Sequence, residues 1–156
     1  MSTRSNIAIL NKEAKTITKI YCHWDGYPEY VGEMLNTYYK DREKIEKLIS
    51  LGSLSVLNEE VEPNPNMTHS FNEPQENVTI AYTRDRGENW EWNKPEELDF
   101  KEFRKFLRNP FDIEYVYLYI DEQVGWVFWK TYGLTRKTDE KLKSAMKNLD
   151  AYLKEE

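Results

Sequence analysis

The sequence of 156 residues has little cysteine, no long apolar run and no excess of positive charge. Its single cysteine, Cys22, excludes an internal disulfide framework and any zinc site that needs two thiolates. No stretch reaches the roughly 18–20 apolar residues that a membrane-spanning helix needs, so a membrane partner is not expected. The N-terminal residues are not followed by a long apolar run, which argues against a secretory signal. We therefore expect a cytoplasmic protein.

The charge balance is negative and uneven. The chain has 22 basic and 28 acidic residues, which gives a formal net charge of −6. A protein that follows the phosphates of duplex nucleic acid is usually basic, so duplex nucleic acid is not an expected partner. Residues 58–77 contain five glutamates and no lysine or arginine. We interpret this segment as a solvated acidic loop, with docking on a basic partner as the alternative.

Length and hydrophobic patterning predict a single α+β domain over residues 1–156. Alternating apolar and polar residues indicate the strands of an antiparallel sheet. A first hairpin joins 5–10 to 16–24, and a central strand covers 78–85. The clearest hairpin joins 113–121 to 124–131 through a two-residue turn.

About four helices are expected to pack on this sheet, because apolar residues recur at helical spacing. Pro28 suits the first turn of a helix, where its missing N–H is not needed. Asp99 and Glu102 form a capping-box pattern. Residues 58–77, rich in proline and asparagine, are typical of a long loop that acts as a lid or binding loop, or is disordered. The expected helices cover 28–39, 42–51, 99–108 and 138–154.

The second hairpin carries an aromatic ladder on one face. Such rings could stack a planar ligand, but cross-strand aromatic pairs also stabilise a sheet without any ligand. With four helices available to cover one sheet, we favour a place in the core. An uncovered ladder would instead be an interface between copies of the chain, so an oligomer is conceivable. The ladder consists of Tyr115, Tyr117, Tyr119, Trp126 and Phe128.

Residues 22–28 leave a predicted strand and enter a predicted helix, whose N-terminus would favour an anion. His23 and Asp25 lie two residues apart, so on an extended segment both side chains point the same way. They could form a general-base pair or bind a metal, with Cys22 on the opposite face. We favour the competing interpretation, in which Asp25 and Gly26 shape a structural turn, Asp25 caps the helix and His23 bonds to a backbone carbonyl.

A second polar cluster, residues 84–88, follows the strand predicted at 78–85. Arg84 and Arg86 beside a glycine could clamp a phosphate or carboxylate, because a guanidinium binds these groups through two hydrogen bonds. Internal salt bridges at a turn are an equally good interpretation. Arg84 follows the alternation of the strand, so we expect it to be partly buried and to need a partner.

His69, inside the acidic loop, is the only other histidine. If the loop folded over the first turn, His23, Asp25 and His69 would supply three metal ligands and leave one position open. That is the usual arrangement of a catalytic zinc ion. Nothing in the spacing requires it, and the sequence identifies no cofactor.

Four segments carry a resemblance that covers roughly residues 1–88. They are Met1-Ser-Thr-Arg-Ser-Asn-Ile-Ala-Ile9, Ile20-Tyr-Cys-His-Trp-Asp-Gly-Tyr-Pro28, Leu51-Gly-Ser-Leu-Ser55 and Ala81-Tyr-Thr-Arg-Asp-Arg-Gly-Glu88. The chain resembles a group of small uncharacterised proteins encoded by bacteriophages and prophages. The resemblance transfers no activity. It implies a phage origin, expression in the cytoplasm of a bacterial host, and an accessory role that acts on host machinery or host defence.

Two functional hypotheses follow. The first is a phage accessory protein that binds a host protein or a small anionic ligand, with a host defence as one target. The alternative is a metal-assisted phosphoester hydrolase or nuclease that uses the two polar clusters; no catalytic residue can be assigned. We expect residues 22–28 and 84–88 to lie side by side at the rim of the sheet. The candidate site residues are His23, Trp24, Asp25, Tyr27, His69, Arg84 and Arg86.

Overall fold

An eight-stranded mixed sheet forms the centre of the computed structural model, which describes residues 2–155. β1 (Ser5–Asn11) pairs antiparallel with β2 (Thr16–Cys22) and parallel with β6 (Tyr115–Asp121). β6 pairs with β7 (Gly125–Lys130), and β7 pairs with the short edge strand β8 (Lys147–Asn148). The expected α+β fold is confirmed, but the prediction of a purely antiparallel sheet is wrong.

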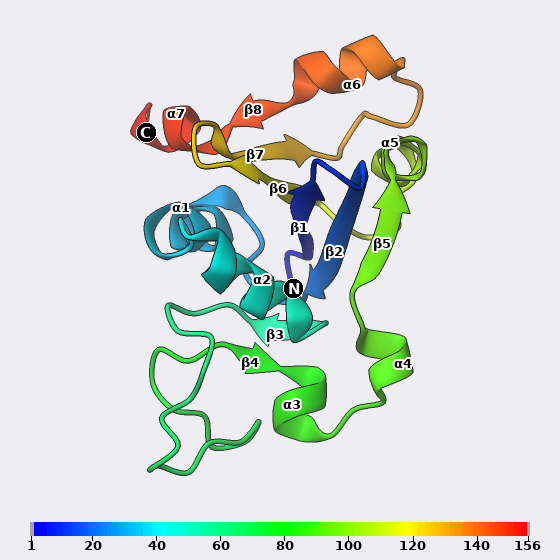
Figure 1. Ribbon diagram of the computed structural model, residues 1–156. Coiled ribbons are helices and arrows are strands. Elements are labelled where there is room, and N and C mark those ends of the chain that lie inside the picture. Colours follow the sequence, from blue (N-terminus) through cyan, green and yellow to red (C-terminus); the bar gives the residue numbers. More distant parts are fainter. Residues whose placement is uncertain (1, 156) are drawn as a thin grey trace.

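Beyond β2 the sheet divides (Figure 1). The end of β2 pairs in parallel with β3 (Leu54–Val56), which pairs antiparallel with β4 (Ile80–Ala81). The start of β2 pairs antiparallel with β5 (Glu96–Asp99). Parallel partners need long crossover connections, and alternation within a strand does not reveal which distant strand it joins. The patterning therefore predicts the hairpins but not these pairings.

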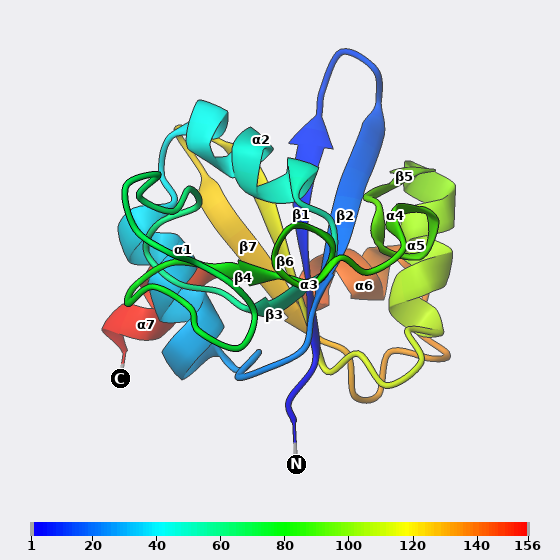
Figure 2. The ribbon, with the colours of Figure 1, turned by 90° about the horizontal axis from the view of Figure 1, so that it is seen from below.

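Helices cover both faces of the sheet (Figure 2). One core contains residues of the helices before β3 together with the last helix, and the other contains residues of the two helices that flank β6 and β7. The first group is η1 (Pro28–Gly32), α1 (Glu33–Tyr38), α2 (Arg42–Ser50) and α7 (Leu149–Lys154), and the second is α5 (Phe100–Arg108) and α6 (Asp139–Ala145). Two further short helices, α3 (Tyr82–Arg86) and α4 (Trp90–Asn93), follow β4. Within residues 2–155, no helix is long and apolar enough to span a bilayer.

The aromatic ladder lies in the core, as favoured above. Tyr117, Tyr119, Trp126 and Phe128 are each at most 3% exposed, and Tyr115 is half-buried against them. The polar atoms of two of these side chains form hydrogen bonds with backbone carbonyls. The Tyr117 hydroxyl donates to the Gly26 carbonyl at 2.6 Å, and the Trp126 indole N–H donates to the Tyr39 carbonyl at 2.9 Å.

The turn between β6 and β7 has three residues rather than two. The register is as expected at Tyr119 and Trp126, but Asp121 then faces Gly125 across a bulge. Gly125 has φ 74°, the left-handed conformation that such a bulge requires. The Asp121 carboxylate accepts hydrogen bonds from the N–H groups of Gln123 and Val124, which fixes the turn.

The single helix predicted at 138–154 is wrong: the segment forms α6, β8 and α7. Met146 has extended backbone (ψ 130°), and the two residues that follow it pair with β7. Leu142 lies in the core beneath α5 and α6, whereas Leu149 lies in the core on the opposite face. The break carries the chain across the edge of the sheet. The apolar residues of this one segment therefore pack in two cores, Leu142 in one and Leu149 in the other.

The strand predicted at 78–85 is also wrong beyond Ala81. The Asp85 carboxylate folds back and accepts a hydrogen bond from the Ala81 N–H at 2.8 Å, at the start of α3. Gly87, with φ 75°, ends this helix in the left-handed conformation that favours glycine. Residues after Ala81 therefore do not alternate between the two faces of the sheet.

Candidate functional site

The turn at residues 22–28 is held rigidly by the N-terminal segment. The Gly26 N–H donates to the Thr3 carbonyl at 2.8 Å, and the Gly26 carbonyl accepts from the Tyr117 hydroxyl. A Cβ at Gly26 would lie only 2.7 Å from the Ser5 Cβ, so glycine is required by this close approach. The segment is a structural turn, as favoured, but two details of that interpretation are wrong. The N-cap residue of η1 is Tyr27 and has no side-chain cap, so Asp25 does not cap the helix. The His23 side chain bonds to the Tyr21 hydroxyl and not to a backbone carbonyl.

His23 pairs with a tyrosine and not with Asp25. Its Nδ1 shares a hydrogen bond with the Tyr21 hydroxyl at 2.5 Å. Asp25 has φ 55°, and its Oδ1 accepts a hydrogen bond from the Tyr27 hydroxyl at 3.4 Å. Burial, followed by the nearby Arg4 guanidinium, lowers the pKa of His23 and favours the neutral imidazole. The alternative interpretation, a His23–Asp25 general-base pair, is therefore wrong.

Cys22 points to the opposite side, as expected. It is fully buried in the core with α1 and α2, and burial raises the pKa of its thiol to about 12. Because the reactive form of cysteine is the thiolate, this residue serves packing.

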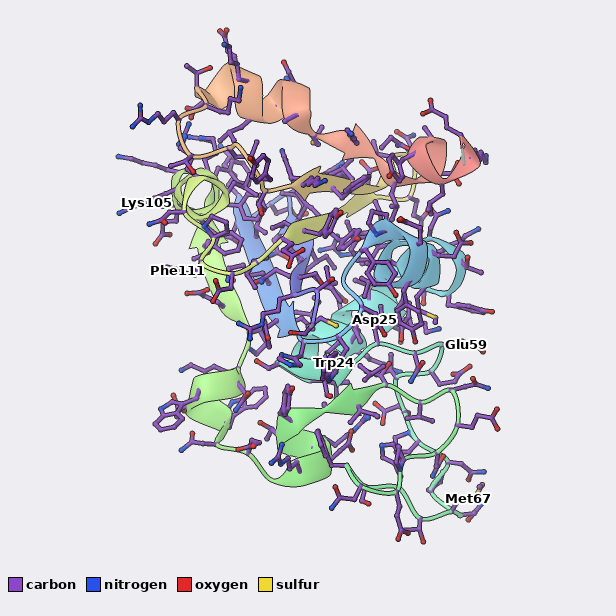
Figure 3. The ribbon with its side chains drawn as sticks, turned by 180° about the vertical axis from the view of Figure 1, so that it is seen from behind. Trp24, Asp25, Glu59, Met67, Lys105 and Phe111 are labelled. Atoms are coloured by element: carbon purple, nitrogen blue, oxygen red, sulfur yellow. The ribbon has the colours of Figure 1, made fainter. Side chains whose placement is uncertain are left out.

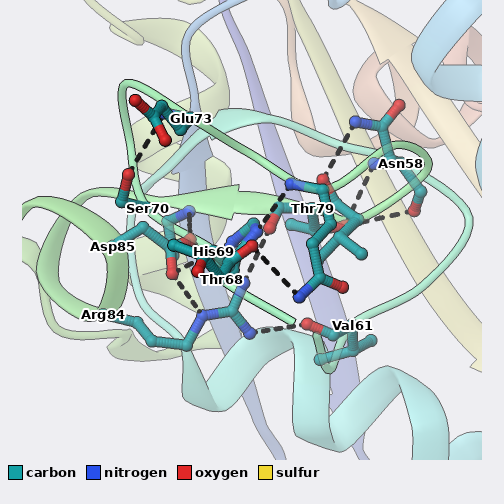
Figure 4. A network of polar contacts seen from close by, with 12 residues as sticks. Asn58, Val61, Thr68, His69, Ser70, Glu73, Thr79, Arg84 and Asp85 are labelled. Carbon is teal, nitrogen blue, oxygen red and sulfur yellow. Dashed lines mark hydrogen bonds and ion pairs between the residues drawn. The ribbon is translucent and has the colours of Figure 1, made fainter. Parts of the chain in front are cut away.

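Arg84 is a structural residue that anchors the acidic loop (Figure 4). Its Nε donates to Asp85 Oδ1 at 2.9 Å, and its two terminal nitrogens donate to the carbonyls of Val61 and Thr79 at 2.5 and 2.7 Å. All three nitrogens are therefore in use inside the protein. The salt-bridge interpretation holds for Arg84, which fastens the start of loop 58–77 to α3.

His69 lies in the same network (Figure 4). Its side chain is 4% exposed, Nδ1 accepts a hydrogen bond from the Gln75 N–H at 3.0 Å, and Nε2 lies 3.3 Å from Asp85 Oδ1. In the part of the chain that the structure describes, no three His, Cys, Asp or Glu side chains are placed to share a metal ion. The alternative metal site of His23, Asp25 and His69 is therefore wrong.

The Asp85 carboxyl is held in its charged form by this network. Burial alone would raise its pKa, but hydrogen bonds from Arg84 and the Ala81 N–H, together with His69, outweigh burial and lower the pKa. A lowered pKa means that the folded protein favours the carboxylate more strongly than the unfolded chain does.

We therefore expect an acid-dependent loss of stability that Asp85→Asn reduces. The contribution of Asp85 is present above its unfolded pKa and is lost as the pH falls through the lower folded pKa, from about pH 4 downward. Urea unfolding at a series of pH values measures this dependence. The exposed aspartates that also have a lowered pKa are common to both proteins and cancel in the comparison. An equal slope in the two proteins would contradict the assigned role of Asp85.

Arg86 is the arginine that faces solvent. Its side chain is 54% exposed, and among the described residues its one ion pair is to Glu88, at 3.5 Å. The guanidinium lies 4.8 Å from the centre of the Phe71 ring, which stacks on Tyr82 at 5.7 Å. Arg86 therefore has donors free for a partner and an aromatic support that holds it in place.

Strand β3 lies between the turn at residues 22–28 and the cluster at residues 84–88. On one side the N–H groups of His23 and Trp24 donate to carbonyls of β3, at 3.0 and 3.1 Å. At the other side of this strand, the Tyr82 N–H donates to the Ser53 carbonyl at 3.1 Å. Burial raises the pKa of Tyr21, the positive charge of Arg4 opposes this rise, and Tyr82 adds to it.

Aromatic side chains thus form a row across β3, with Phe71 and Tyr82 on one side and Tyr21, His23 and Trp24 on the other. The exposed Trp24 ring meets His23 edge-on, with 4.8 Å between ring centres. Figure 3 shows Trp24 and Asp25 close to β3, while Met67 lies at the tip of the acidic loop. We call this row the aromatic–arginine surface; it consists of Arg4, Tyr21, His23, Trp24, Phe71, Tyr82 and Arg86.

A groove of about 1140 Å³ adjoins Arg4 at the ends of β1, β6 and β7. Two exposed rings line it, Phe111 at 80% and Tyr132 at 90% exposure. Arg4 has one ion pair, of 3.4 Å, to the exposed Asp112. The sequence analysis did not find Arg4, because its place depends on the parallel pairing of β1 with β6. One signal could have placed Arg4 near Tyr21: in the first hairpin Tyr21 pairs with Asn6, and Arg4 lies two residues before Asn6, on the same face by alternation.

Comparisons of the chain with protein-family models, with curated proteins and with solved structures find no match.

Proposed function

We propose that this chain is an accessory binding protein that docks on a host protein through the aromatic–arginine surface. The observation that carries the proposal is the pairing of exposed arginines with supported rings. Within residues 2–155, Arg4 and Arg86 each have one ion pair, of 3.4 and 3.5 Å, to an exposed carboxylate, and the Arg86 guanidinium lies over the Phe71 ring. Tryptophan, tyrosine and arginine are the residue types that most often dominate binding energy at protein interfaces.

The partner that suits this surface presents acidic side chains. A guanidinium binds a carboxylate through two hydrogen bonds, and Arg86 keeps an exposed guanidinium for that purpose. The surface draws on four separate segments of the sequence, a spread that favours a protein over a small anionic ligand. A protein with a net charge of −6 would repel an acidic partner elsewhere, so the two arginines also fix where it docks.

The resemblance to phage and prophage proteins supplies the expected setting. It favours a partner in the bacterial host cell, with host machinery or a host defence protein as the target. The alternative of a metal-assisted hydrolase has no assembled ligand set among residues 2–155, so we do not develop it.

We expect Trp24→Ala and Arg86→Ala to weaken partner binding. The wild-type chain is used to capture a partner from bacterial lysate, and dissociation constants of the isolated partner are then measured for each variant. Trp24→Ala should weaken binding about thirtyfold or more, as loss of a hot-spot residue does. Arg86 is exposed, so Arg86→Ala should change the free energy of unfolding by no more than about 0.5 kcal/mol.

Met67→Ala is the matched control, because Met67 is exposed at the tip of the acidic loop. It should bind the partner as the wild type does. If Trp24→Ala and Arg86→Ala bind normally while Met67→Ala does not, the binding site is the acidic loop and the proposal is wrong.

A further inference from the structure

A pocket of about 370 Å³ lies between α5 and α6, in the core that these two helices cover. The strands β2, β6 and β7 contribute Ile17, Leu118 and Trp129 to its lining, and the two helices contribute most of the other residues. The volume lies near the lower end of the range for small-molecule sites. The pocket shares no residue with the aromatic–arginine surface.

The pocket follows from the break in the C-terminal helix. A continuous helix over 138–154 would lay one apolar stripe along a single face of the sheet. Instead α6 ends at Ala145, and Leu149 packs in the core on the opposite face. The face beside α5 therefore receives only the seven residues of α6, which leaves space between the two helices.

The inside of the pocket is apolar. Phe103, Leu107 and Leu142 line it together with the three strand residues, and each of these six side chains is at most 5% exposed. The indole N–H of Trp129 is the one polar group among the six, and it donates to the Leu142 carbonyl at 2.8 Å. The Phe103 and Trp129 rings already meet edge-on, at 5.7 Å between ring centres. The interior therefore suits an alkyl chain, which has no hydrogen-bonding group to satisfy.

Charged side chains at the rim leave a small excess of positive charge. Arg104 Nε lies 3.3 Å from Asp139 Oδ2, and Arg108 binds the same carboxylate. Lys143 and Glu140 also line the pocket, and neither has an ion-pair partner among residues 2–155. Three cations thus face two carboxylates, so the rim favours an anion over a cation. Lys143 is exposed and is the cation free to bind it.

We infer that this pocket binds a free alkyl carboxylate of medium length, such as octanoate or decanoate. The alkyl chain lies between α5 and α6 against Leu107 and Leu142, and the carboxylate accepts hydrogen bonds from Lys143 at the rim. Burial of the chain supplies the affinity, because each buried methylene strengthens binding about fourfold. Lys143 selects the anion over the matching alcohol.

Calorimetric titration of the full chain with hexanoate, octanoate and decanoate tests this inference. Affinity should rise about fourfold per methylene, and octanol should bind more weakly than octanoate. Lys143→Gln should weaken octanoate binding about three- to fivefold, as loss of an exposed ion pair does. Lys141→Gln is the matched control. It removes the same charge from an exposed position of the same helix but does not line the pocket, so it should bind octanoate normally.

Met146→Trp tests the interior of the pocket, because Met146 lines it and is half-buried. The larger side chain should take up part of the space, so decanoate binding should weaken about tenfold or more, as if two methylenes were no longer buried. Met146→Leu changes the volume little and should bind decanoate as the wild type does.

The two lysines are exposed, so unchanged melting temperatures will show that their variants are folded. The inference is overturned if decanoate does not bind at about 5 mM, where a ligand of this size is expected to bind detectably. It is equally overturned if affinity does not rise with chain length, if octanol binds as tightly as octanoate, or if the two lysine variants bind octanoate alike. None of these results bears on the docking surface, because Trp24 and Arg86 lie outside the pocket.

Discussion

Replacing Asp85 with alanine is expected to lower the free energy of unfolding by about 3–5 kcal/mol, the usual cost of removing one partner of a buried ion pair. The Asp85 side chain is 3% exposed. One carboxylate oxygen accepts from Arg84 Nε at 2.9 Å, and the other accepts from the Ala81 N–H and from Arg84 Nη2. Alanine would leave the Arg84 Nε–H and the Ala81 N–H without their acceptors and would remove the charge that faces the guanidinium. Denaturant unfolding monitored by tryptophan fluorescence measures the loss.

Glu88→Ala is the control for this change. Glu88 is close in sequence and 44% exposed, so its removal should cost no more than about 0.5 kcal/mol. Asp85→Ala should also make residues 58–77 more accessible to limited proteolysis, because Arg84 and His69 anchor that loop to Asp85. A loss below about 1 kcal/mol, with unchanged proteolysis, would contradict the anchoring role.

Gly52→Ala is expected to be the second severe change, and Gly87→Ala supplies its matched comparison. Both glycines have φ +75°, so an alanine pays a similar backbone penalty of about 1–2 kcal/mol at either position. At Gly87 a Cβ would meet nothing within 4 Å. At Gly52 it would overlap the Asn93 carbonyl oxygen, the acceptor that ties α4 to Ser53.

The difference between the two variants isolates this overlap. Gly52→Ala should lose about 1–3 kcal/mol more than Gly87→Ala, in line with the cost of overpacking. Chemical denaturation of both variants measures this difference directly. Equal losses of stability in the two variants would show that the contact between Gly52 and Asn93 does not hold α4.

Local patterns predicted what depends on neighbours in the sequence. The first hairpin, the capping box of Asp99 and Glu102, and the burial of the aromatic ladder all follow from spacing and residue type. The three-residue turn after Asp121 was not predictable in this way, because a bulge adds one residue without changing the alternation on either side.

Long-range pairing limited the prediction of the site. Arg84 was expected to share a strand face, but the Asp85 carboxylate turns the chain into α3 and directs Arg84 to the acidic loop. His69 was tested as a partner of His23, yet it lies against Asp85. The position of Arg4 in the aromatic–arginine surface depends on the pairing of β1 with β6. The position of Tyr82 depends on its hydrogen bond to Ser53, next to β3. Neither relation leaves a periodic signal in the sequence.

The central claim is that the partner docks on the aromatic–arginine surface. Hydrogen–deuterium exchange of the full chain, measured with and without the captured partner, tests this most directly because it maps the contact without any substitution. We expect slower exchange in residues 21–27 and 82–88 when the partner is bound, with residues 58–77 unchanged. Protection confined to residues 58–77, with 21–27 and 82–88 exchanging as in the free chain, would contradict the claim.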